Sequence, residues 1–160
     1  MSLSPGRQRA RRDRSDAILL AEAGLNRLRC ATPGRFPIPI IDLVPAPAQG
    51  ALAIECRASD AATRLLLHAI DDEATHHAAI AERAVLAAVD PTDSTAVGAV
   101  ATMAAGRLHL LADISRPDGR GRIVLRATSS VASGRAGASA AEALGASMGA
   151  ELRLRSMRSW

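Results

Sequence analysis

The chain has 160 residues, of which 48% are hydrophobic and 1% aromatic, and its formal net charge is +4. This length supports one compact domain with a core of Ala, Leu, Val and Ile, and it is short for two domains. All 20 basic residues are arginine. Because this bias runs through the whole Ala-rich chain, it indicates a GC-rich genome rather than selection for a nucleic-acid partner, and we expect no such partner.

Residues 1–14 contain the densest group of basic side chains, which are Arg7, Arg9, Arg11, Arg12 and Arg14. No aromatic side chains alternate with them to stack on bases, so we expect a disordered leader. The charged start is not followed by an apolar run with a cleavage site, and the apolar stretches are shorter than a membrane span. With two cysteines and no visible secretory signal, the chain is expected to be cytoplasmic, thiol-reduced and free of membrane contact.

Residues 15–57 begin with helix-capping chemistry. Ser15 and Asp16 predict a helix that extends to about Arg29. Residues 31–50 contain five prolines, which predict an extended connector. The short apolar run at residues 51–56 then predicts a buried strand, in which Cys56 would be a small apolar filler.

Residues 58–160 show the pattern of a self-contained unit. Helices are expected from Ser59 or Asp60 to about residue 70, from residues 71–73 to about residue 89, and over residues 139–155. Three strands are expected at residues 97–103, 107–115 and 122–128, joined by turns at residues 105–106 and 117–119. This order predicts an α+β fold, in which helices cover one face of a three-stranded antiparallel sheet.

Three stretches carry a family resemblance: DAILLAEAGLNRLR at residues 16–29, VPAPAQGALAIECR at residues 44–57, and AERAVLAAVDPTDSTAVGA at residues 81–99. They resemble the C-terminal part of hydroxymethylbilane synthase, also called porphobilinogen deaminase. The resemblance implies that residues 15–57 are the end of domain two, a connector and one strand of domain one, and that residues 58–160 are domain three. It also implies tetrapyrrole biosynthesis, in which four porphobilinogen units condense stepwise with loss of ammonia.

The cofactor cysteine of this family is replaced. Asp93 stands where the resemblance places the cysteine that carries the covalent dipyrromethane cofactor, and Pro91 and Thr92 stand where two glycines belong. A thiolate forms a stable thioether with an azafulvene, whereas a carboxylate forms at best a labile ester. We therefore expect no dipyrromethane in this chain.

Four further positions match residues that the resemblance places at the cofactor cleft: Arg27, Gln49, Gly50 and Arg57. Arg27 suits bidentate carboxylate binding, but it is equally typical of the last turn of any helix. Gln49 and Gly50 are equally typical of a simple turn before a strand. Arg83 also matches a family arginine, and we interpret it as a surface or ion-paired helix residue.

The parts of the family that hold its catalytic aspartate have no counterpart here, so no catalytic residue is assigned. The paired acidic and histidine residues at 72–77 lack a third convergent ligand, so no metal site is expected. Two hypotheses remain. Either the chain is an enzyme component that needs a separate chain with the missing N-terminal domains, or it is a truncated, non-catalytic remnant or interaction module.

Overall fold

The computed structural model describes residues 16–29, 34–90 and 96–159, and it divides into two units, Met1–Pro39 and Ile40–Trp160. The expected leader, Cys30 and Asp93 lie outside the described residues.

In the first unit, the helix expected from residue 15 or 16 is much shorter than predicted. Helix α2 is Glu22–Arg27, and its N-cap is Ala21, which makes no side-chain capping bond. Asp16 lies in a bend, so the predicted start is wrong. None of the helical residues is buried, and a helix of six residues without packing gains too little to propagate toward Asp16.

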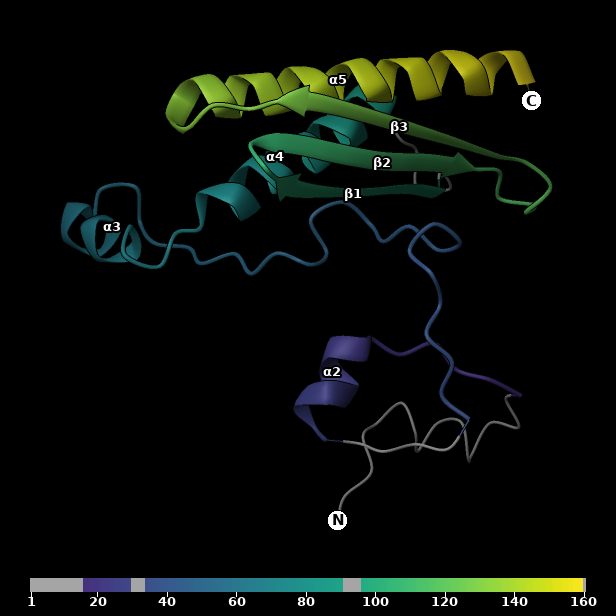
Figure 1. Ribbon diagram of the computed structural model, residues 1–160, viewed down its shortest axis with the longest axis horizontal. Coiled ribbons are helices and arrows are strands. Elements are labelled where there is room, and N and C mark those ends of the chain that lie inside the picture. Colours follow the sequence, from purple (N-terminus) through teal and green to yellow (C-terminus); the bar gives the residue numbers. More distant parts are fainter. Residues whose placement is uncertain (1–15, 30–33, 91–95, 160) are drawn as a thin grey trace. The chain divides into compact units, whose positions relative to one another are not determined.

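The second unit is an α+β layer, as predicted (Figure 1). In chain order, its elements are α3 (Ala61–Leu67), α4 (Glu73–Val89), β1 (Ala96–Ala104), β2 (Arg107–Ser115), β3 (Arg122–Ser130) and α5 (Gly134–Ser159). The strands form an antiparallel meander in the order β1-β2-β3. Helices α4 and α5 pack on each other and cover one face of this sheet (Figure 1).

The core lies between that face and the two helices. On β2, every second residue points inward, so Leu108, Leu110, Ala112 and Ile114 are buried, as the alternation predicts. Ala81, Val85 and Val89 of α4 and Ala141, Met148 and Leu152 of α5 complete the core. The helices approach closely because α5 presents glycine to α4: a Cβ at Gly145 would overlap the carbonyl of Ala81, and one at Gly149 would overlap that of Val85.

Local signals fix most boundaries of the second unit. Asp60 and Asp72 are the N-caps of α3 and α4, and each accepts a hydrogen bond from a backbone N–H, at Thr63 and Thr75 respectively. The backbone and side-chain hydrogen bonds to Thr63 lower the pKa of Asp60, and the side-chain and backbone hydrogen bonds to Thr75 lower the pKa of Asp72. Ala105 and Gly106 both have positive φ, which is the backbone geometry of a tight two-residue hairpin turn.

Three expectations for this unit are corrected. Residues 51–56 are extended but form no strand, and Leu52 is 90% exposed, because no neighbouring strand pairs with them among the described residues. Cys56 is accordingly exposed rather than buried. Helix α5 begins at Gly134, five residues before the predicted start, because the Gly134 N–H donates to the carboxylate of Glu73 and ties the start of α5 to the start of α4.

Candidate functional site: the strap on the first strand

Residues 41–48, which we call the strap, lie along β1 in the second unit. Val44 is buried, and the backbone N–H of Ala99 donates to the carbonyl of Pro45 at 2.9 Å. Gly98 makes this approach possible, since a Cβ there would lie 2.8 Å from the Cβ of Val44. Part of the Pro-rich connector is therefore packed against the sheet.

Glu82 of α4 joins the strap to β1. One of its carboxylate oxygens accepts the backbone N–H of Ala48 and the other accepts that of Ala101, both at 2.6 Å. Only 8% of Glu82 is exposed. A buried carboxylate needs such donors to offset its lost hydration, so both bonds are charge-assisted and strong for their type.

The sequence analysis did not single out Glu82, which is one residue of the similar stretch 81–99. A signal for its role was present, because Glu82 lies four residues after Ala78 and three before Val85 on the inward face of α4. A charged residue in an apolar stripe indicates a buried partner. The sequence could not show that the partners are two backbone N–H groups 53 residues apart.

The other end of the strap is held by an ion pair between the exposed Arg122 and the buried Asp113. Arg122 of β3 donates through Nε to Asp113 of β2 at 2.6 Å and through Nη2 to the carbonyl of Ile41 at 2.7 Å. The alternation of β2 puts Asp113 on the face opposite the core residues Ala112 and Ile114. The strap covers it there, so Asp113 is only 7% exposed.

The strap brings together two of the stretches that carry the family resemblance. Ala48 meets Glu82, Val44 meets Gly98, and Pro45 meets Ala99. The first member of each pair comes from residues 44–57 and the second from residues 81–99. These residues therefore have a packing role in addition to any chemical one.

Three of the predicted site residues, Gln49, Gly50 and Arg57, lie among the described residues of the second unit, and all three are exposed. Gln49 and Gly50 follow the strap and are exposed. The side chain of Gln49 accepts a hydrogen bond from the backbone N–H of Ala46, as a residue of a simple turn would. Arg57 is exposed on the extended segment beyond. Arg27 is exposed in the last turn of α2, in the first unit. Arg83 is exposed on α4, as expected.

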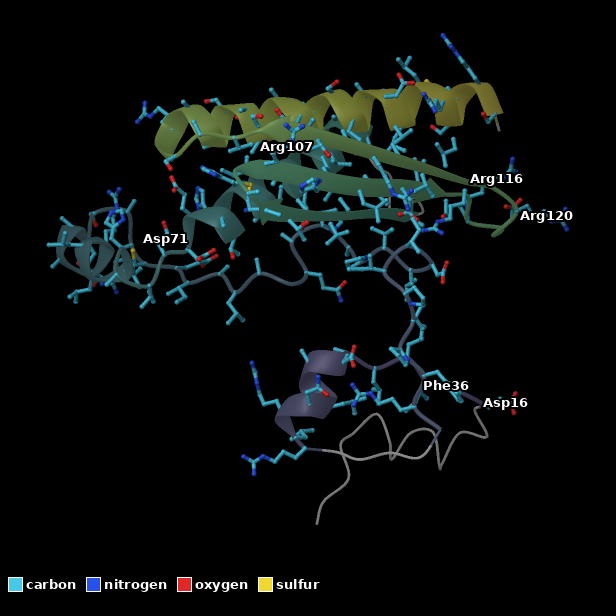
Figure 2. The ribbon with its side chains drawn as sticks, in the orientation of Figure 1. Asp16, Phe36, Asp71, Arg107, Arg116 and Arg120 are labelled. Atoms are coloured by element: carbon cyan, nitrogen blue, oxygen red, sulfur yellow. The ribbon has the colours of Figure 1, made fainter. Side chains whose placement is uncertain are left out.

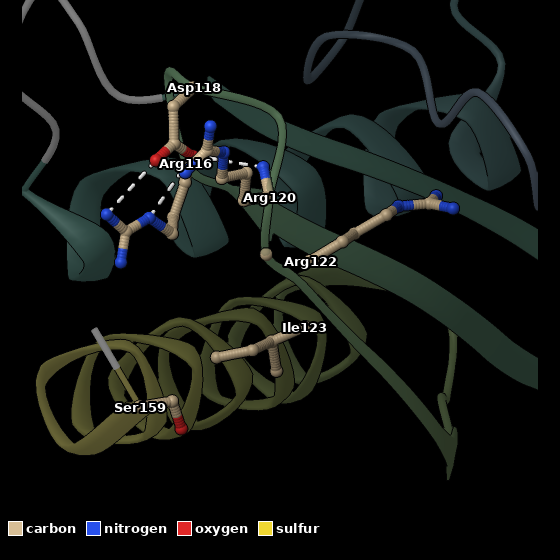
Figure 3. Close-up of a pocket in the computed structure, with 7 residues that line it drawn as sticks. Arg116, Asp118, Arg120, Arg122, Ile123 and Ser159 are labelled. Atoms are coloured by element: carbon tan, nitrogen blue, oxygen red, sulfur yellow. Dashed lines mark hydrogen bonds and ion pairs between the residues drawn. The ribbon is translucent and has the colours of Figure 1, made fainter.

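A cavity lies elsewhere in the second unit, at the β2–β3 hairpin (Figure 3). It measures about 540 Å³, and Arg116, Asp118 and Arg120 line it with neighbouring residues. Figure 2 shows Arg116 and Arg120 near the tip of this hairpin. Asp118 pairs with the guanidinium of Arg116 and accepts the backbone N–H of Arg120, so the carboxylate is engaged within the turn. None of the predicted cofactor residues lines this cavity.

Two further observations concern metal ligands and membrane-spanning helices. Among residues 16–29, 34–90 and 96–159, no three His, Cys, Asp or Glu side chains group as metal ligands. No helix within these same ranges is both long and apolar enough to cross a bilayer.

The fold and the strap define the second unit as a small α+β domain built on an antiparallel meander. Comparison with known proteins shows which proteins this chain resembles. Residues 7–65 match the family model described as "Porphobilinogen deaminase, dipyromethane cofactor binding domain". The match ends before Asp93.

Several curated proteins named porphobilinogen deaminase are similar to this chain. Porphobilinogen deaminase of Mycolicibacterium gilvum (strain PYR-GCK) is 46% identical over 86 residues, which are 54% of this chain and 28% of that protein. The Sphingopyxis alaskensis protein is 47% identical over 110 residues, with 66% and 33% covered, and the Mycobacterium leprae protein is 40% identical over 108 residues, with 68% and 31% covered. The resemblance to porphobilinogen deaminase is thus confirmed. The chain spans about a third or less of these relatives.

The described residues of the second unit do not fit a bound dipyrromethane. Cys56 is exposed, and it does not line the cavity at the β2–β3 hairpin. Gln49, Gly50 and Arg57 are likewise exposed and do not line it. An oligopyrrole with several carboxylates needs convergent donors in a shared cleft, and these residues do not supply one.

Proposed function

We propose that this chain acts in tetrapyrrole biosynthesis as part of a porphobilinogen deaminase-like enzyme, and that it has no such activity by itself. The observation that carries the proposal is the 40–47% identity to relatives of which only 28–33% is covered. The proposed reaction of the complete assembly is the stepwise condensation of four porphobilinogen units with loss of ammonia. We further propose that it acts in the cytoplasm.

The partner we propose is a second chain that carries the rest of such an enzyme. The extended residues 51–57 support this, because Leu52 and Ile54 are 90% and 61% exposed. Helix α3 supports it as well, since it buries no residue of its own and exposes Leu65 and Leu66 by more than 70% each. We propose that these exposed apolar side chains contact the second chain.

A second candidate function is a non-catalytic remnant or interaction module without tetrapyrrole chemistry. The replacement of the cofactor cysteine by Asp93 favours it. The coding context distinguishes the two candidates. A neighbouring reading frame with the missing domains supports the enzyme component, whereas an intact synthase elsewhere in the genome supports the remnant.

Asp93→Cys by itself is expected to create no porphobilinogen deaminase activity. The thiol restores a nucleophile, but positioning of reactants contributes roughly 7–11 kcal/mol of barrier reduction in well-oriented reactions. The exposed Gln49, Gly50 and Arg57 provide no cleft for that positioning. The assay is porphobilinogen consumption with uroporphyrin detection, for the wild type and the variant.

Both proteins are then assayed with a second chain, namely the part of the M. gilvum enzyme that this chain does not match. Activity that requires the second chain supports the enzyme component. Turnover by the variant without it would refute the proposed dependence, and turnover by the wild type with it would show that Asp93 does not prevent the reaction.

Purified wild-type protein is expected to carry no covalent dipyrromethane. Its intact mass should equal the sequence mass, apart from loss of the initiator methionine, because neither Asp93 nor an exposed cysteine outside a cleft retains the cofactor. Intact mass spectrometry and peptide mapping measure this. An added mass located at Asp93, Cys30 or Cys56 would contradict the expectation.

A further inference from the structure

The two edges of the three-stranded sheet differ in how they are covered. At the β1 edge, the backbone N–H groups of Ala99 and Ala101 donate to the carbonyl of Pro45 and the carboxylate of Glu82. The opposite edge is β3, and α5 packs along this strand (Figure 1). Another strand would therefore join the sheet more readily at β3.

The register identifies which backbone groups of β3 face outward. At the two ends of the β2–β3 ladder, the N–H of Arg116 donates to the carbonyl of Gly121, and the N–H of Val131 donates to the carbonyl of Gly106. Both bonds join an odd-numbered residue on the β3 side to β2, and bonded residues alternate along an antiparallel pair. The N–H and C=O groups of the even-numbered residues of β3 therefore point away from β2. Those within the strand are Val124, Arg126 and Thr128.

A groove lies between this edge and α5. Its volume of about 260 Å³ is below the range of about 300–1,000 Å³ that is typical of small-molecule sites. Its apolar lining consists of Leu125 and Ala127 of β3 with Leu144 and Met148 of α5. Met148 is buried, whereas the other three are only partly buried. The groove therefore suits an apolar side chain of an extended segment better than it suits a cofactor.

The charges at this groove favour an acidic partner. Arg126 lines the groove and is exposed. Glu151 of α5 is the acidic residue of the lining, and it accepts a hydrogen bond from Nε of Arg155 at 2.6 Å. The carboxylate of the groove is thus already paired. A carboxylate opposite Arg126 on an added strand gains a cross-strand pair of opposite charge.

A second copy of β3 fits this edge less well. Its sequence RIVLRATSS contains two arginines and no acidic residue. When two copies pair antiparallel about Arg126, the two guanidinium groups stand opposite each other, which is destabilising. The arginines therefore oppose pairing of this edge with itself and attract a strand that carries carboxylates.

We propose that the groove between β3 and α5 binds an extended acidic segment of a partner protein, which joins the sheet as a fourth strand. The backbone of this segment pairs with Val124, Arg126 and Thr128, and one of its carboxylates stands opposite Arg126. The side chains on either side of that carboxylate point to the other face of the sheet, so apolar residues there enter the groove. This inference does not depend on the proposed tetrapyrrole function.

The probe is the peptide TELEVET, acetylated and amidated at its ends, in which leucine and valine flank the central glutamate. Titration into the ¹⁵N-labelled full chain, followed by NMR, should show saturable binding with shifts centred on the amides of Val124, Arg126 and Thr128. Exchange of these amides with solvent should slow. The control peptide is methylated at the backbone nitrogen of the central glutamate, so it keeps every charge but loses one strand bond. It should bind at least about tenfold more weakly.

Two variants separate the charge from the groove. Arg126→Glu should weaken TELEVET binding by at least about tenfold and make the protein prefer TKLKVKT, in which lysine replaces each glutamate. Ser147→Trp places a large side chain in the groove from an exposed position, and it should weaken TELEVET binding by at least about tenfold. Ala146→Trp is its control, because Ala146 is exposed on α5 and does not line the groove.

The proposal is overturned if TELEVET does not bind at concentrations up to about 1 mM. Equal binding of the methylated peptide would show attraction between charges without strand pairing, and an unchanged peptide preference in Arg126→Glu would exclude the charge pair. Either result also overturns the proposal, as does self-association that Ser147→Trp abolishes in the absence of peptide binding, since it assigns the groove to a second copy. If Ser147→Trp loses its circular dichroism signal, Arg126→Glu with the two peptides decides.

Discussion

Gly145→Ala is expected to lower the free energy of unfolding of the second unit by about 2–3 kcal/mol, the upper part of the usual range for overpacked cores. A Cβ at this position would lie 2.9 Å from the backbone carbonyl carbon of Ala81 and closer still to its oxygen. A backbone cannot move aside as the end of a flexible side chain does, so α4 and α5 must separate. The intrinsic preference of helices for alanine over glycine, about 1 kcal/mol, opposes this loss without cancelling it.

Urea denaturation followed by far-UV circular dichroism measures the change. Gly24→Ala is the control, because Gly24 is also helical and nothing lies within 4 Å of its Cβ position. The control should leave the unfolding midpoint of the second unit unchanged. An unchanged midpoint in Gly145→Ala would mean that the two helices do not pack as closely as described.

Leu152→Ala is expected to cost about 3 kcal/mol of stability, within the range for a leucine removed from a core. Leu152 is fully buried and is among the largest such side chains, together with Leu108 and Val85. Its truncation leaves a cavity between α5 and the sheet that neighbouring side chains fill only in part. The same denaturation experiment measures the loss.

Leu154→Ala is the matched control, two residues further along the same helix and 50% exposed. This substitution removes the same side-chain atoms and changes the helix propensity in the same way, but at a half-exposed position. It should therefore lower the free energy of unfolding by less than about 1 kcal/mol. Equal losses in the two variants would show that α5 presents a different face to the sheet.

The strap changes how the family resemblance is understood. Glu82, Gly98 and Ala99 lie in one similar stretch, and their partners Ala48, Val44 and Pro45 lie in the other. Both stretches therefore contribute to the packing of this domain, whatever chemistry they also carry. Similarity in these residues supports the relationship to porphobilinogen deaminase, and the activity has to be tested separately.

Elements that depend on near neighbours in the chain were predictable from the amino-acid sequence. The alternation of Leu108, Leu110, Ala112 and Ile114 predicted a half-buried strand, and that face is the core face. Asp60 and Asp72 predicted the starts of α3 and α4, because a capping side chain bonds to an N–H only three residues away. Turn chemistry at residues 105–106 and 117–119 then predicted the antiparallel meander.

Features that depend on distant partners were not predictable from the amino-acid sequence. The start of α5 is set by Glu73, 61 residues earlier, and the strap is set by Glu82 and Arg122, which lie 34 and 81 residues from the backbone groups they hold. Residues 51–56 have the composition of a strand, yet a strand also needs a neighbour, which the described residues do not provide. Local patterns record which face of an element is apolar, whereas hydrogen bonds between distant segments exist only once the chain has folded.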